Sequence, residues 1–234
     1  MRTITDVNPM TTDLGYNTTL QYANPVTVDS EHNRIYTFGT PSAGGTPVIR
    51  YVNYPAGTGV SYPRPTNLLS VSALEYRDGF LYMVGTNSSG TAALFRYVPT
   101  VTAGAALMVT TAALEYPMDI LVKSDYIYVA NYNSITPANH RILKFDRNTL
   151  AFIGAYGTGI PPATPDDNRP GYFYGPFLFL AENNRKIYLI DEATGTGNGQ
   201  NRVVAFDEVG TWKGWEIFRS EDLNPANEYR YYYC

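Results

Sequence analysis

The chain of 234 residues has a single cysteine, at its last position, and only two histidines. One cysteine excludes an internal disulfide and a cysteine-based zinc site, and two histidines leave little room for histidine-rich metal chemistry. We therefore predict no metal, no cofactor and no residues that bind one. Cys234 is interpreted either as a link between chains or as a plain terminus.

Charged residues are also scarce, at 16 % of the chain, and the net charge is −4. A chain without a basic excess is not expected to bind nucleic acid, nor to be held to anionic lipid by charge. No apolar run is long enough to span a membrane, and the N-terminal region lacks the apolar run of a signal peptide. The sequence contains 21 tyrosines and few lysines, which favours an extracellular or cell-surface protein whose Met1 begins a mature or trimmed chain. The alternative is a cytoplasmic protein of unusual composition.

What the sequence does contain is a repeat. A short apolar segment ending in an aliphatic residue and a tyrosine occurs four times, and the first three of these tyrosines are spaced by 46 and 46 residues. An apolar segment precedes each tyrosine by eight residues, a second one follows it, and a weaker one closes the unit. The four tyrosines are Tyr36, Tyr82, Tyr128 and Tyr188, and the residues eight positions earlier are Val28, Leu74, Ile120 and Leu180.

Four strands per unit and a period near 46 residues predict an all-β fold, a β-propeller built from four-stranded antiparallel blades. A β-sandwich would not give equally spaced repeats. We expect one domain over residues 1–234, with blades at about 23–62, 66–109, 112–156 and 172–218.

The ends of the chain, residues 1–22 and 219–234, leave three architectures open. They form a fifth blade together, or they are appendages of a four-bladed ring, or they supply strands to neighbouring copies of the chain.

Two of the units, covering about residues 112–218, resemble NHL repeats. In each, a proline precedes the first strand, the second strand ends in Asn131 or Asp191, and the third begins with an arginine and ends in Phe-Asp. The resemblance implies a propeller that binds proteins, glycans or nucleic acids through loops at one rim; a minority of such propellers are metal-dependent hydrolases or lyases. We interpret Asp191, Arg202 and Asp146 as structural residues that tie strands together.

Motifs for nucleophilic catalysis and for phosphate binding are absent. Within the predicted first strands, Asp119 is the only acid, beside Asp29 at the end of one. We therefore predict no catalytic residue and no enzyme, but a non-catalytic extracellular module for protein binding or self-assembly, a structural protein whose partners include copies of itself. The alternative is a propeller hydrolase or lyase with its site at the central channel. The candidate assembly or ligand contacts are Tyr229, Tyr231, Tyr232, Tyr233, Trp212 and Trp215.

Overall fold

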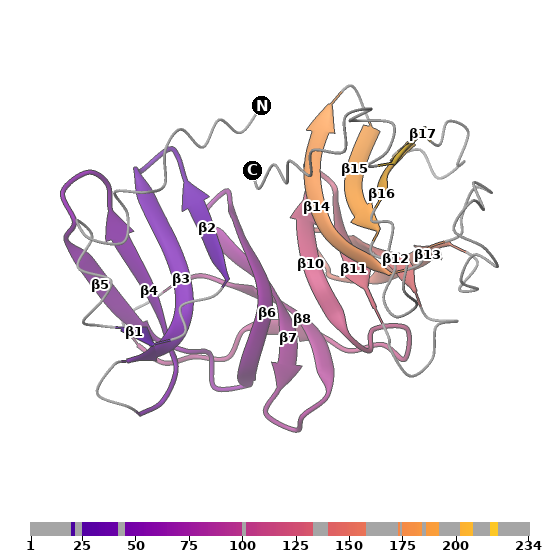
Figure 1. Cartoon of the computed structure of the whole chain (residues 1–234). Coiled ribbons are helices and arrows are strands. Elements are labelled where there is room, and N and C mark those ends of the chain that lie inside the picture. Colours follow the sequence, from indigo (N-terminus) through magenta and orange to yellow (C-terminus); the bar gives the residue numbers. More distant parts are fainter. Residues whose placement is uncertain are drawn as a thin grey trace.

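In a computed structural model, four antiparallel sheets follow one another along the chain and lie around a common centre (Figure 1). The structure describes residues 20–21, 25–41, 45–99, 102–132, 140–157, 173, 175–183, 186–191, 202–207 and 216–219. Within these residues there is no helix, and hence none that could cross a membrane.

Each sheet is a meander of short strands. The first comprises β1 (Leu20–Gln21), β2 (Val26–Asp29), β3 (Arg34–Pro41), β4 (Val48–Asn53) and β5 (Gly59–Pro63). The second comprises β6 (Leu68–Arg77), β7 (Phe80–Asn87), β8 (Ala92–Tyr97) and β9 (Leu107–Val109). The third comprises β10 (Pro117–Val122), β11 (Tyr126–Asn131), β12 (Arg141–Asp146) and β13 (Phe152–Tyr156). The fourth comprises β14 (Pro176–Asn183), β15 (Lys186–Asp191), β16 (Arg202–Asp207) and β17 (Glu216–Arg219).

The predicted fold class is confirmed. In every sheet the strands pair in chain order, from an inner strand to an outer one, and the inner strands β2, β6, β10 and β14 contact one another in succession. The repeated tyrosines all lie on the second strand of a blade, on β3, β7, β11 and β15. The extra strand β1 pairs with the end of β3, beyond the part of β3 that pairs with β2.

The hydrophobic core lies between neighbouring sheets. Strands place alternate side chains on opposite faces, so an interior blade can bury apolar residues against the blade on either side. Three clusters fill the three junctions, each with buried residues from both sheets. They include Tyr36, Ile49, Leu74 and Phe95 at the first junction, Tyr82, Leu94, Ile120 and Phe145 at the second, and Tyr128, Ile142, Ile187 and Phe206 at the third.

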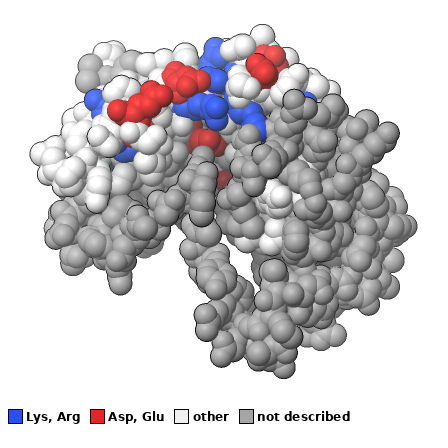
Figure 2. All heavy atoms as spheres, turned by 90° about the horizontal axis from the view of Figure 1, so that it is seen from above, with Lys and Arg blue, Asp and Glu red and all other residues white. Residues whose placement is uncertain are grey.

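Arginine contacts also join the second and third sheets. Arg147, in the hairpin between β12 and β13, donates from Nε to the hydroxyl of Tyr82 (3.0 Å), from one terminal nitrogen to Asp78, and from the other to the carbonyl of Ser124 (3.1 Å). In return, Arg96 of the second sheet donates to the carbonyls of Arg147 and Asn148. This junction lies at the ends of β6 and β10 that point upward in Figure 1, and the face seen from above carries Lys and Arg residues beside Asp and Glu residues (Figure 2).

We expect Arg147→Met to lower the free energy of unfolding by about 1–3 kcal/mol, because it removes charge-assisted hydrogen bonds from a mostly buried position. Arg147→Lys should restore only part of the loss, since an ammonium cannot reach three partners in the guanidinium geometry. Urea denaturation measures both variants. The matched control is Asp78→Asn, which weakens only the exposed ion pair and should cost less than about 1 kcal/mol. Equal losses in Arg147→Met and Asp78→Asn would contradict this account.

Candidate active site

Each inner strand is linked to the next by a side-chain oxygen. Oγ1 of Thr27 on β2 accepts from the backbone N–H of Tyr76 (3.1 Å), and Oε2 of Glu75 on β6 accepts from that of Val122 (2.8 Å). Asp119 Oδ2 on β10 accepts from the backbone N–H of Phe179 on β14 (2.8 Å). The inner strand has one edge without a neighbouring strand in its own sheet, so backbone groups there need partners from elsewhere.

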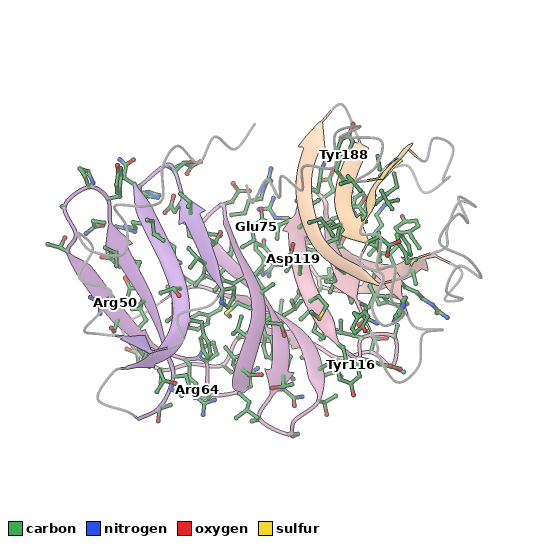
Figure 3. The ribbon with its side chains drawn as sticks, viewed as in Figure 1. Arg50, Arg64, Glu75, Tyr116, Asp119 and Tyr188 are labelled. Carbon is green, nitrogen blue, oxygen red and sulfur yellow. The ribbon has the colours of Figure 1, made fainter. Side chains whose placement is uncertain are left out.

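Two of these oxygens belong to acids that lie in the space enclosed by the inner strands, where Figure 3 shows Glu75 and Asp119 between β6 and β10. Glu75 is buried and Asp119 is partly buried. The prediction missed Glu75, which directly follows the repeated apolar residue Leu74, because β6 extends beyond Leu74 as far as Arg77. The premise that Asp119 and Asp29 are the only acids of the inner strands is therefore wrong.

Asp29 stabilises the turn between β2 and β3 through its side chain. Its carboxylate is buried, accepts from the backbone N–H of His32 (3.2 Å) and lies 2.8 Å from Nδ1 of the same residue. The hydroxyl of Tyr76 also forms a hydrogen bond with Asp29. The pKa of Tyr76 is raised to about 12, mainly by burial and next by the negative charge of Asp29. With the exposed Glu31, Asp29 and His32 bring three metal-ligating side chains to within 4.8 Å of one another. The hydrogen bonds within the turn account for the closeness of Asp29 and His32.

An open cleft lies at the opposite end of the inner strands, between the second and third sheets. Its volume is about 670 Å³, and the segment that leads into β10 forms one wall with Glu115 and Tyr116. Tyr116 is 47 % exposed, and Figure 3 shows this residue at the lower end of β10. The second sheet contributes three residues that carry hydroxyl groups, Ser72, Thr86 and Thr91, and the hydroxyl of Thr86 hydrogen-bonds with that of Ser70. A carboxylate, an accessible aromatic ring and several hydroxyls suit a polyhydroxylated ligand.

A buried amide fixes the wall of the cleft. Oδ1 of Asn131, at the end of β11, accepts from the backbone N–H groups of both Glu115 (3.0 Å) and Tyr116 (3.2 Å). In the fourth sheet, Asp191 occupies the same place at the end of β15 and accepts from the N–H of Gly175 (2.7 Å). The second strand of a blade thus positions the residues that enter its inner strand. The predicted tie between Asp191 and Arg202 stays a prediction.

Asp146 is likewise structural. Its Oδ1 accepts from the backbone N–H and hydroxyl of Thr149, both at 2.8 Å, and from the N–H of Asn148 at 3.0 Å. These hydrogen bonds, chiefly those from Thr149, hold the pKa of Asp146 below its usual value. The predicted contact residues Trp212, Trp215, Tyr229, Tyr231, Tyr232 and Tyr233 lie outside the described residues.

Comparison with known proteins gives no match to a family model and none to a curated protein. Solved structures do match. A GH43_1 enzyme from Xanthomonas citri, complexed with xylose, has a TM-score of 0.50 and 14 % identity over 86 % of this chain and 74 % of that one. The Bacteroides ovatus xyloglucan protein GH43B has a TM-score of 0.49 and 14 % identity; the match covers 86 % of this chain but only 41 % of that one. A Bombyx mori GH32 β-fructofuranosidase has a TM-score of 0.40 and 12 % identity, over 86 % of this chain and 48 % of that one.

The chain has the β-propeller fold. At such low identities the likeness concerns the fold, and it agrees with the four sheets described above. It does not support propeller repeats of the NHL type, since the structure that matches with a TM-score of 0.50 is that of a GH43_1 enzyme. The motif that suggested NHL repeats consists of residues such as Asn131 and Asp191, which build a blade and specify no chemistry.

The predicted non-catalytic module is corrected by the same finding. The similar structure from Xanthomonas citri is that of an enzyme, so the likeness gives no support to a structural, non-enzymatic protein. The prediction failed because it assumed that the inner strands carry almost no acidic residues. Glu75 lies within an inner strand, and Glu115 was not considered because it precedes a strand.

Proposed function

We propose that the chain is a glycoside hydrolase that cleaves a glycosidic bond of a neutral glycan in the cleft between the second and third sheets. A fold alone does not define a function, so the proposal depends on the site. The observation that carries it is the position of Glu115: it lies in the wall of an open cleft, its backbone N–H is held by Asn131, and it stands beside the exposed Tyr116.

Glycosidic bond cleavage commonly uses two carboxyl groups, one to protonate the leaving oxygen and one to act as base or nucleophile on the other side of the sugar. In our proposal Glu115 is the proton donor, because it is the acid that lines the cleft. Asp119 is the second carboxylate in our proposal, because it lies on β10, directly after the segment that carries Glu115, and is less buried than Glu75; it is not among the residues that line the cleft. Glu75 then keeps the structural role of holding β10 to β6.

The cleft also suggests how a sugar would be held. The apolar face of a pyranose or furanose ring would stack on Tyr116, and the hydroxyls of Ser72, Thr86 and Thr91 would exchange hydrogen bonds with those of the sugar. The structure from Xanthomonas citri is a complex with xylose, which makes pentosides the first substrates to try. The extracellular location remains a prediction, and it agrees with a glycan substrate.

The proposal is tested by incubating the full chain with a panel of aryl xylosides, arabinosides and fructosides and with the corresponding oligosaccharides. Release of a reducing sugar is measured, and we expect turnover of at least one pentoside. Tyr116→Ala should raise KM more than it lowers kcat, because stacking binds the substrate and the transition state alike. Lack of turnover across the panel, together with no binding of any of these sugars by calorimetry, would overturn the proposed function.

A further inference from the structure

The inner strand of the first sheet exposes an apolar face. Val28 is 56 % exposed, whereas the residues at its position in the next two repeats, Leu74 and Ile120, are 7 % and 5 % exposed. Val26, two residues earlier on the same face of β2, is exposed as well. The three positions are equivalent in sequence, since each precedes the repeated tyrosine by eight residues, so the difference comes from what covers them.

Leu74 and Ile120 are covered by the sheet that precedes their own. Leu74 belongs to a cluster with Tyr36 and Ile49 of the first sheet, and Ile120 belongs to a cluster with Val84 of the second. By the same rule, Val28 should be covered by a sheet that precedes the first one around the ring. No such sheet is present among the described residues, where the fourth sheet ends with β17 at Arg219.

We propose that residues 228–234 of the same chain form an inner strand that packs on Val26 and Val28 and so brings the two ends of the ring together. Between 4 and 19 residues separate an outer strand from the next inner strand in the described sheets, and residue 228 follows β17 at a distance within this range. Side chains alternate along a strand, so Tyr229, Tyr231 and Tyr233 would share one face, and that aromatic face suits the two valines. This inference is independent of the proposed function.

The lone cysteine makes the proposal testable. Val28→Cys adds one thiol to the exposed face, and Cys234 is the only other thiol in the chain. A short bismaleimide should join the two within one molecule. At micromolar protein this reaction should be on the order of a thousandfold faster than cross-linking between molecules, because a tethered group has an effective concentration in the millimolar range. Mass spectrometry of the digested product identifies the linked peptides.

The matched control is Val60→Cys, which places a thiol on a half-exposed valine of the outer strand β5 in the same sheet and should give little cross-link to Cys234. Val26→Cys is a second test of the same face, should Val28→Cys fold poorly. Cross-links that form only between molecules would overturn the proposal in favour of a strand given to a second copy. A cross-link that is no more frequent from positions 26 and 28 than from position 60 would also overturn it.

Discussion

Replacing Glu115 by glutamine is expected to lower kcat for unactivated glycosides by about 10²- to 10⁴-fold, the range in which a positioned general acid contributes. The amide has the shape of the carboxyl group but cannot release a proton to the leaving oxygen. The two hydrogen bonds that hold this wall come from backbone N–H groups to Asn131, so the substitution leaves them in place. The fold and the cleft should therefore be preserved.

Substrates with different leaving groups distinguish a residue that donates a proton from one with a merely structural role. A dinitrophenolate departs without protonation, so Glu115→Gln should reduce hydrolysis of a dinitrophenyl glycoside far less than hydrolysis of a methyl glycoside. Asp119→Asn should be slow with both substrates, because a base or nucleophile is needed whatever the leaving group. Its amide oxygen can still accept from Phe179, which keeps β10 attached to β14.

The matched controls are Glu75→Gln and Glu31→Gln. Glutamine at position 75 can still accept from the N–H of Val122, so in our assignment it keeps most of the activity. Glu31 is an exposed acid in the turn after β2, at the other end of the inner strands from the cleft, and its substitution should have no effect. If Glu75→Gln loses as much activity as Asp119→Asn, the second carboxylate is Glu75. Equal activity of Glu115→Gln and Glu31→Gln would rule out Glu115 as the acid.

The fold could be predicted from the sequence because its regularities are local. The period of 46 residues in the first three units and the apolar residue eight positions before each of the four tyrosines reflect one blade pattern, and each of the four observed sheets contains it. The cleft could not be predicted in this way. Its walls come from Ser72, the hairpin after Gly85 and the segment before β10, which are up to 44 residues apart and meet only when two blades pack. Glu115 carries no signal of its own, since it stands in no motif that implies chemistry.

The contacts between blades escaped prediction for the same reason. Arg96 and Arg147 are ordinary basic residues in the sequence, yet each donates to the neighbouring sheet, to carbonyls in one case and to Tyr82 and Asp78 in the other. A repeat indicates which residues build a blade, because those positions recur. Contacts between unlike blades do not recur, so their residues are visible only in the folded chain.

Gly85 packs closely against β6 within the second blade and also lines the cleft. Replacing it by alanine is expected to lower the free energy of unfolding by about 2–4 kcal/mol. A Cβ at this position would collide with the backbone carbonyl oxygen of Ser70 and lie 2.8 Å from the Cα of Val71. Both atoms belong to β6, which pairs with β7 through a shift in register just after Val71. Backbone atoms of a paired strand cannot move aside as the end of a flexible side chain can.

The control for Gly85→Ala is Gly154→Ala on β13, where an added Cβ meets no atom within 4 Å and the backbone is not in the left-handed region. That variant should be neutral or slightly stabilising, because alanine restricts the unfolded chain. Thermal and urea unfolding of the two variants give the comparison. Because Gly85 lines the cleft and its neighbour Thr86 carries one of the hydroxyls there, folded Gly85→Ala protein should also bind substrate more weakly. An unchanged stability would mean that β6 and β7 can separate at low cost, and it would contradict the close approach on which this wall of the cleft depends.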